Sequence, residues 1–215
     1  MARLRLGVLV SGRGSNLQAL IDAAADPAFP AEVALVLSNK PDAYALERAR
    51  AAGIATAVVP HKGFPDKPAF EQAMTAELEA AGVRLVCLAG FMRLLSPWFV
   101  RHWHDRLINI HPSLLPSFPG LDTHRRALET GVRFHGCTVH YVREAMDDGP
   151  ILVQAAVPVL PGDDEHALSA RVLEQEHRAY PLAVRLIAEG RARVEGNLVV
   201  LEGTSAPPAA LNPAD

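Results

Sequence analysis

This chain of 215 residues contains little cysteine and has no excess of positive charge. The only cysteines are Cys87 and Cys137, and neither belongs to a Cys-x-x-Cys pair. A disulfide framework and a cysteine zinc site are therefore disfavoured, and we interpret both cysteines as small buried apolar residues. The formal net charge is -3. Without a broad basic surface, nonspecific nucleic-acid binding is not expected.

Long apolar runs are also missing. The apolar run at residues 4–10 is too short to span a membrane, and no small-residue cleavage site follows it. The hydrophobic content of 49% and the charged content of 21% argue against disorder and against a coiled coil. We therefore expect a cytoplasmic protein without a membrane partner, of about one domain.

The first half of the chain alternates between strand and helix patterns. Apolar, largely β-branched runs predict strands at residues 4–10, 33–37, 54–59 and 83–89. Helices are predicted at the spacing of Leu17, Leu20 and Ile21, from Pro41 through Ala52, and over about 68–81. Repeated strand–helix–strand units predict an α/β fold with a doubly wound, mostly parallel sheet and helices on both faces.

The second half of the chain is less regular, and antiparallel additions to the sheet are expected there. Three prolines predict a loop from His111 to Gly120. The other expected elements are strands at 107–110, 137–142 and 151–159, a helix over about 165–189 capped by Asp163-Asp164, and a hairpin over 192–201 turning at Gly196-Asn197. We predict a single domain over 1–203, followed by a flexible tail over 204–215.

A glycine-containing loop lies where the first strand meets the first helix, with Gly12, Gly14, Ser15 and Asn16 in succession. N–H groups at a helix start bind phosphate oxygens, and glycines let the backbone approach. Leu17 replaces the third glycine of a dinucleotide fingerprint, and the second strand ends without a carboxylate, so NAD is disfavoured. A mononucleotide phosphate fits better, and a tight turn with no ligand remains the alternative.

A polar pair stands at the end of the fifth expected strand. Asn109 and His111 flank Ile110, so both lie on one side of an extended segment. Pro112 keeps His111 out of helical geometry. Because parallel sheets bind ligands at the carboxyl ends of their strands, His111 is a candidate functional residue.

The remaining titratable residues carry weaker signals. His102 and His104 lack a third ligand at helical spacing, so no metal site is expected. Asp147 and Asp148 are typical of a solvated turn, although a carboxylate beside a histidine favours the charged imidazole. Spacing alone does not show that His111 meets these acids. We interpret the other histidines as surface or capped residues: His61, His102, His104, His124, His135, His140, His166 and His177.

Four segments together resemble a known family. They are SGRGSNLQA at 11–19, AGFMRLLSP at 89–97, NIHPSLLP at 109–116 and DDGPI at 147–151. From about residue 5 to residue 203 the chain resembles the folate-dependent phosphoribosylglycinamide formyltransferases. The HPSLLP motif is shared with other formyltetrahydrofolate hydrolases and transferases, whereas the glycine loop together with the short length of the chain is specific to the glycinamide enzymes. The RNA-contacting domain of methionyl-tRNA formyltransferases and the regulatory domain of formyltetrahydrofolate deformylases are not expected in a chain of this length.

The resemblance implies a reaction of de novo purine biosynthesis. The amine of glycinamide ribonucleotide attacks the formyl carbon of the cosubstrate 10-formyltetrahydrofolate, giving formylglycinamide ribonucleotide and tetrahydrofolate without a metal. By position, Asn109, His111 and Asp147 match the catalytic residues of the family. Asn109 and protonated His111 would stabilise the oxyanion, and Asp147 would keep the imidazole charged. The partners are then the ribonucleotide and a reduced folate, with the protein a monomer or a homodimer.

The resemblance also assigns binding residues and two halves of the domain, a nucleotide-binding half over about 1–105 and a folate and catalytic half over about 106–203. The ribonucleotide residues are Gly14, Ser15, Asn16, Leu17 and Glu176, the last at the ribose hydroxyls. The folate residues are Lys67, Met92, Arg93, Leu94, Leu95, Asn109, Arg143, Glu144, Ala145, Met146 and Asp147. The apolar character of residues 92–95 also fits a plain exit from a core strand.

Two positions depart from the family pattern. Lys67 stands where some relatives have an arginine, which keeps the charge but loses bidentate geometry. Asp148 stands where glycine is common, and it could compete with Asp147 for the histidine or stiffen the loop.

Two alternative functions remain open: another folate formyl enzyme, such as a sugar-amine formyltransferase or a hydrolase, and a non-catalytic nucleotide-binding module.

Overall fold

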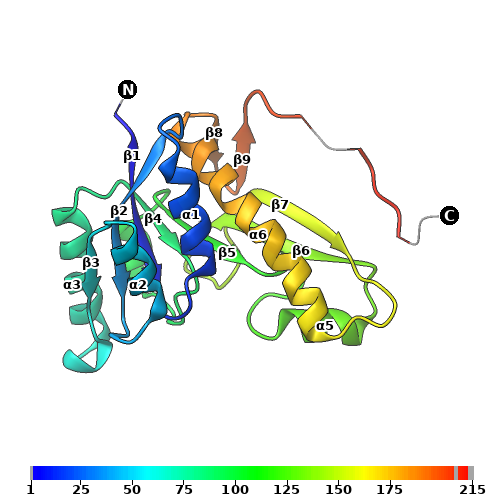
Figure 1. Cartoon of the computed structure of the whole chain (residues 1–215), viewed down its shortest axis with the longest axis horizontal. Helices are drawn as coiled ribbons and strands as arrows, with labels where there is room; N and C mark the ends of the chain where they lie inside the picture. Colours follow the sequence, from blue (N-terminus) through cyan, green and yellow to red (C-terminus); the bar gives the residue numbers. More distant parts are fainter. Residues whose placement is uncertain (1, 206–207, 213–215) are drawn as a thin grey trace. The chain divides into compact units, whose positions relative to one another are not determined.

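The computed structural model describes residues 2–205 and 208–212 (Figure 1). These residues divide into two units. The first unit holds the residues up to Asn109 together with Tyr141–Glu144, and the second holds Ile110–His140 and the residues from Ala145 onward. The expected flexible tail over 204–215 lies partly outside the described residues. The single domain over 1–203 stays a prediction.

Parallel strands and helices alternate along the first unit. Its strands follow the order β3-β2-β1-β4-β5, and each neighbouring pair is parallel. The order runs outward from β1 in both directions, which confirms the predicted doubly wound arrangement. The elements are β1 (Leu4–Val10), α1 (Ser15–Ala25), β2 (Ala31–Ser38), α2 (Tyr44–Ala51), β3 (Thr56–Val58), the 3-10 turn η1 (His61–Gly63), α3 (Lys67–Ala80), β4 (Leu85–Leu88), α4 (Pro97–His102) and β5 (Leu107–His111), whose last two residues belong to the second unit.

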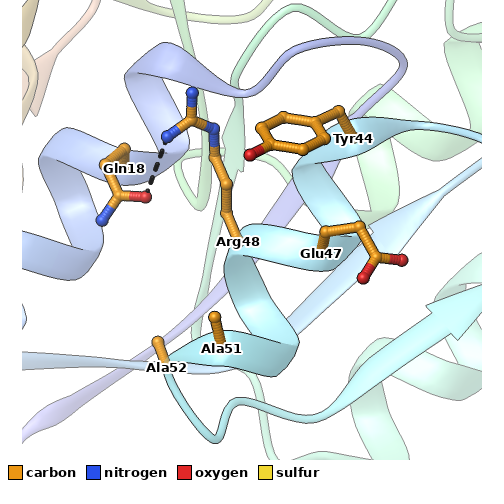
Figure 2. Close-up of a pocket in the computed structure, with 6 residues that line it drawn as sticks. All are labelled: Gln18, Tyr44, Glu47, Arg48, Ala51 and Ala52. Atoms are coloured by element: carbon orange, nitrogen blue, oxygen red, sulfur yellow. Dashed lines mark hydrogen bonds between the residues drawn. The ribbon is translucent and has the colours of Figure 1, made fainter.

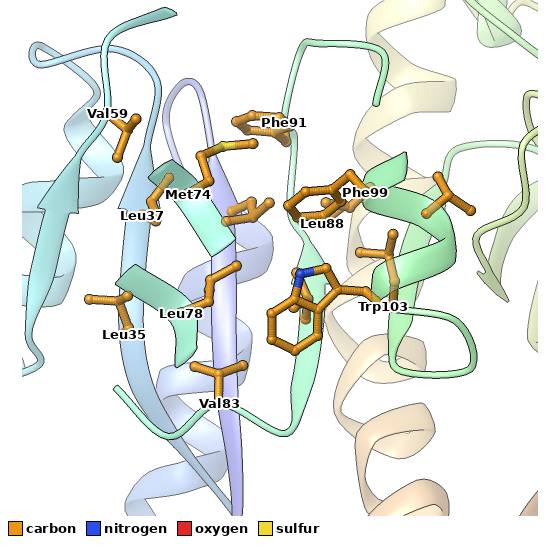
Figure 3. Close-up of a cluster of buried hydrophobic side chains, with 14 of the residues drawn as sticks. Leu35, Leu37, Val59, Met74, Leu78, Val83, Leu88, Phe91, Phe99 and Trp103 are labelled. Atoms are coloured by element: carbon orange, nitrogen blue, oxygen red, sulfur yellow. The ribbon is translucent and has the colours of Figure 1, made fainter. Parts of the chain in front are cut away.

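The core of the first unit follows from strand alternation. One face of the sheet contributes Leu9, Leu35 and Leu37 to a buried cluster with residues of α3 and α4. Figure 3 shows Met74 and Leu78 of α3 in this cluster. The alternate residues of β1, Leu6, Val8 and Val10, are also fully buried, as are Leu17 and Leu20 of α1 and Leu46 of α2. Helices therefore cover both faces of this sheet, as the continuous apolar strands predict.

The second unit contains antiparallel strands. Its hairpin pairs β6 (Phe134–Tyr141) with β7 (Ile151–Pro158), and α6 (Glu165–Ala188) packs on β7. Gly136 is required in β6 because a Cβ there would lie 2.0 Å from the carbonyl oxygen of Ala155. A second hairpin, β8 (Ala192–Glu195) with β9 (Leu198–Leu201), turns at the predicted Gly196-Asn197. The predicted antiparallel additions are confirmed.

The structure differs from the sequence prediction at several strand ends, at the start of one helix and in two helices that were not predicted. Helix α2 begins at Tyr44 and not at Pro41. Helix α4 was not predicted, although Ser96 caps it and Pro97 occupies its first turn, a recognised start signal. Helix α5 (Thr123–Thr130) was also missed; it is short, and left-handed Gly131 ends it. Among the helices of the described ranges, none combines the length and the apolar character needed to cross a membrane.

Candidate active site

The candidate site of the second unit is centred on His111, whose side chain is only 7% exposed. Its Nδ1 lies 3.5 Å from Oδ2 of Asp147, and its Nε2 lies 3.1 Å from the carbonyl oxygen of Phe118. Both ring nitrogens therefore face oxygen acceptors, an arrangement that a doubly protonated imidazole satisfies by donating on both sides. Two of the three predicted catalytic residues thus lie together.

Asp147 is held by its backbone as well as by its partners. Its φ of 55° places it in the left-handed region, which aspartate tolerates better than most residues. The N–H of Gly120 donates to Oδ2 at 2.8 Å, and Nε2 of His140 lies 3.8 Å from Oδ1. Asp148, in contrast, is exposed. Of the two acids in the turn, Asp147 is therefore the one that faces His111.

The loop after His111 is anchored by two residues that the sequence reasoning missed. Thr138 donates its hydroxyl to the carbonyl of Ser113 at 2.7 Å and accepts the N–H of Leu115 at 3.1 Å. Gln154 donates to the carbonyl of Leu115 at 2.9 Å. The sequence signal for these two residues was a polar side chain inside each of the predicted strands 137–142 and 151–159. These bonds fix the loop that brings the Phe118 carbonyl and the Gly120 amide to the site.

The glycine loop belongs to the first unit. Gly14 adopts φ 74°, and α1 begins at the next residue, so the loop directs the first-turn N–H groups outward from the helix end. Ser15 and Asn16 are half-buried, whereas the side chain of Leu17 is fully buried in the core. Leu17 therefore offers a ligand only its backbone.

The segment after β4 exposes apolar side chains. Met92 and Leu94 are 67% and 71% exposed, so they do not belong to the core. Leu95 packs against the core cluster, and the guanidinium of Arg93 lies 5.9 Å from the centre of the Phe70 ring. Interpreting residues 92–95 as a plain exit from a core strand therefore does not fit Met92 and Leu94.

The other predicted residues are distributed over both units. In the first unit, Arg143 pairs with Asp105 at 2.6 Å, and Glu144 pairs with Arg101 at 3.1 Å. Exposed Lys67 begins α3, and half-buried Asn109 lies in β5. In the second unit, Ala145 and Met146 are exposed, and Glu176 is buried on α6.

The buried thiol of Cys137 lies near Glu176. Burial and the charge of Glu176 raise the pKa of Cys137 to about 12. The thiol therefore stays protonated and unreactive at neutral pH, in line with its interpretation as a structural residue. Within residues 2–205 and 208–212 no three His, Cys, Asp or Glu side chains are grouped as metal ligands, and His102 pairs instead with Glu79 at 2.8 Å.

Comparison with known proteins identifies the family of this chain. Residues 4–184 match the family model described as formyl transferase. The chain belongs to the formyl transferase family. It is 48% identical over 205 residues to phosphoribosylglycinamide formyltransferase of Escherichia coli, covering 95% of this chain and 97% of that protein. It is also 55% identical over 193 residues to the trifunctional purine biosynthetic protein adenosine-3 of Drosophila pseudoobscura, but it spans only 14% of that protein's length.

Solved structures agree with this membership. Glycinamide ribonucleotide transformylase 1 from Symbiobacterium toebii is 50% identical with a TM-score of 0.90, covering 93% of this chain and 94% of that one. A formyltetrahydrofolate deformylase from Pseudomonas syringae has a TM-score of 0.86 at 27% identity, covering 93% of this chain and 66% of that one. The fold is therefore similar to that of a transformylase and to that of a deformylase.

Two histidines of this formyl transferase correct the sequence interpretation. His135 and His140 are 0% and 2% exposed, so describing them as surface or capped residues is wrong. The ring of His135 meets those of Phe118 and His124 edge-on, at centroid distances of 5.8 and 5.2 Å. Burial, with the nearby charge of His124, lowers the pKa of His135 from 6.5 to about 4. His135 is therefore neutral at physiological pH.

This neutral histidine predicts an acid-sensitive fold. The unfolded chain binds a proton at His135 near pH 6.5, and the folded chain only near pH 4, so stability is complete above about 6.5 and declines as the pH falls toward 4. The free energy of unfolding is expected to fall when the pH is lowered from about 7.5 to about 4.5. In His135→Gln this fall should be smaller than in the unaltered protein by about 2–3 kcal/mol. Urea unfolding at both pH values measures this, with exposed His166→Gln as the control. Equal pH dependence in all three proteins would contradict it.

The start of helix α4, which follows residues 92–95, is hydrogen-bonded to a buried carboxylate. Glu71 of α3 is fully buried and accepts hydrogen bonds from the N–H of Ser96, at 2.7 Å, and from its hydroxyl. Glu71→Ala leaves both donors without this acceptor and is expected to lower the free energy of unfolding by about 2–3 kcal/mol. Urea unfolding measures the loss. Glu77→Ala, on the exposed side of α3, is the matched control, and an equal effect in both variants would exclude a special role for Glu71.

Proposed function

We propose that this chain is a phosphoribosylglycinamide formyltransferase, which transfers the formyl group of 10-formyltetrahydrofolate to the amine of glycinamide ribonucleotide in purine biosynthesis. The buried His111–Asp147 pair carries the proposal, because it sets a histidine with acceptors on both sides in the HPSLLP motif. The near end-to-end similarity to the E. coli enzyme of this name supports the choice of substrates.

The proposed chemistry is a direct acyl transfer. The amine nitrogen bonds to the formyl carbon, and the carbonyl oxygen takes up the negative charge of a tetrahedral intermediate. The bond from that carbon to N10 of the folate then breaks as one proton passes from the attacking nitrogen to N10. The positive imidazole of His111 and the amide of Asn109 stabilise the oxyanion, and the carboxylate of Asp147 stabilises the imidazolium. No covalent enzyme intermediate is needed.

The contacts of His111 indicate which ring nitrogen donates to the oxyanion in this reaction. Nε2 of His111 lies 3.1 Å from the carbonyl of Phe118, whereas Nδ1 faces Asp147. Nε2 is therefore the nitrogen that donates a hydrogen bond to the oxyanion, either in place of the Phe118 carbonyl or in addition to it. The carboxylate keeps its side of the ring throughout, so the ring orientation is preserved.

The binding residues divide by chemistry. The N–H groups of Gly14, Ser15, Asn16 and Leu17 suit the phosphate of the ribonucleotide, and the carboxylate of Glu176 suits its ribose hydroxyls. The folate residues are those expected from the sequence, residues 92–95, Asn109 and residues 143–147. Exposed Met92, Leu94 and Met146 supply apolar surface for a pterin, and exposed Lys67 supplies charge for the folate carboxylates.

One assay tests the activity against its nearest alternative. The purified protein is mixed with 10-formyltetrahydrofolate, with and without glycinamide ribonucleotide, and tetrahydrofolate and formylated ribonucleotide are measured. We expect both products only when the ribonucleotide is present. The likeness to the P. syringae deformylase keeps a hydrolase as the second candidate. Tetrahydrofolate and formate formed at the same rate without the amine would favour that hydrolase.

A further inference from the structure

The glycine loop of the first unit is packed against helix α2. The N–H of Ala45 donates to the carbonyl of Gly12 at 3.0 Å. A Cβ added to Gly14 would lie 2.6 Å from Cβ of Ala45, so the loop backbone touches the helix and only glycine fits. The conformation of the loop is therefore set in part by the residues of α2.

Arg48, one turn further along α2, reaches the same loop. Its Nε donates to the carbonyl of Arg13 at 2.9 Å, and its Nη1 donates to Oε1 of Gln18 on α1 at 3.1 Å. Its guanidinium lies 5.1 Å from the centre of the Tyr44 ring. Figure 2 shows this side chain extending from α2 toward Gln18. It lines a surface cavity of about 580 Å³. One planar group thus ties the loop to both helices.

The bond to Arg13 fixes more than one carbonyl. The carbonyl of Arg13 and the N–H of Gly14 belong to a single planar trans peptide, so the two groups point in opposite directions. Holding the carbonyl against the guanidinium therefore aims the N–H of Gly14 away from Arg48. A charged donor on the carbonyl also polarises the peptide and strengthens its N–H as a donor.

We propose that Arg48 is a positioning residue, which holds the Arg13–Gly14 peptide so that the Gly14 N–H donates to the phosphate of the ribonucleotide substrate. The inference rests on the proposed function, which assigns that phosphate to the glycine loop. Arg48 acts through the loop and does not itself touch the substrate.

Helix α2 supplies a matched control. Arg50 lies two residues along the chain and pairs with Glu47 at 2.5 Å on the exposed side of the helix. Arg48→Met keeps an unbranched apolar stem but removes every donor. Arg50→Met removes a similar charge from the same helix. A difference between these two variants therefore reports the bonds to the loop and not the charge of α2.

The first measurement is steady-state kinetics of Arg48→Met, Arg48→Lys and Arg50→Met. For Arg48→Met we expect KM for glycinamide ribonucleotide to rise about 10-fold, as for loss of a charge-assisted hydrogen bond, with kcat and KM for the formyl donor within about 2-fold. Arg48→Lys, which donates but has no planar fork, should recover part of the loss. A ribonucleotide KM within about 2-fold of normal in Arg48→Met, or equal rises in both KM values, would overturn the proposal.

The second measurement does not depend on catalysis. Inorganic phosphate is titrated into each protein while the NMR signal of the Gly14 amide is followed. In the unaltered protein and in Arg50→Met we expect a saturable shift of this signal. In Arg48→Met the midpoint of the shift should lie at a phosphate concentration about 10-fold higher. Should the unaltered protein transfer no formyl group, the proposed function fails, yet this titration still decides the role of Arg48. Equal midpoints in all variants, or no shift in any, would overturn it.

Discussion

Replacing His111 by alanine is expected to lower kcat by about 100- to 1000-fold, the usual cost of losing one donor to a developing oxyanion. The ring is buried and lies between Asp147 and the carbonyl of Phe118, so water that enters the space carries no fixed positive charge. The loss should fall on kcat, because the negative charge develops only in the transition state. KM for both substrates should stay within about 3-fold.

The measurement is the initial rate of tetrahydrofolate formation at saturating concentrations of both substrates. His166→Ala is the matched control, because that histidine is exposed on α6. Urea unfolding of each variant separates lost chemistry from lost structure. A value of kcat within 10-fold of normal in a folded His111→Ala protein would remove His111 from the proposed mechanism.

Much of the first unit could be predicted because its local and global signals agree. Strands β1 and β4 are nearly continuous apolar runs, which only a sheet covered on both faces requires. Helix α3 begins beside Asp66, whose side chain accepts the N–H of Ala69, and it ends at Ala80, close to the predicted residue 81. Helix α5 escaped prediction because it is only 8 residues long and mostly polar, and its buried residues, Thr123 and Ala127, are small or polar. It therefore offers no series of large apolar side chains at helical spacing.

The candidate site was less accessible to local reasoning. Residues 135–141 of β6 are all buried, so the strand has no exposed side and its alternation does not show which residues face the interior. His135 and His140 were misread for that reason. His111 and Asp147 are far apart in the sequence, and no periodicity links a strand end to a distant turn. Their pairing was expected only from the family resemblance, because tertiary packing of the hairpin and the loop brings them together.

Asp147 gives the second large expected effect, and asparagine is the substitution that isolates its charge. An amide oxygen can still accept the N–H of Gly120, and asparagine tolerates the left-handed backbone that Asp147 adopts at φ 55°. The turn should therefore keep its shape. What is lost is the negative charge 3.5 Å from His111, which in the proposed mechanism stabilises the positive imidazole.

For Asp147→Asn we expect kcat to fall at least about 100-fold, while the unfolding free energy changes by less than about 1 kcal/mol. Asp148→Asn removes the same charge from the exposed neighbouring residue and should leave kcat within about 2-fold. Both variants are assayed for tetrahydrofolate formation and for urea unfolding. If Asp148→Asn lost the activity and Asp147→Asn kept it, the acid that serves His111 would be the exposed one, and the turn would have to rearrange when substrates bind. Equal losses would instead point to the charge of the whole turn, since a general field does not distinguish two adjacent carboxylates, whereas a contact does.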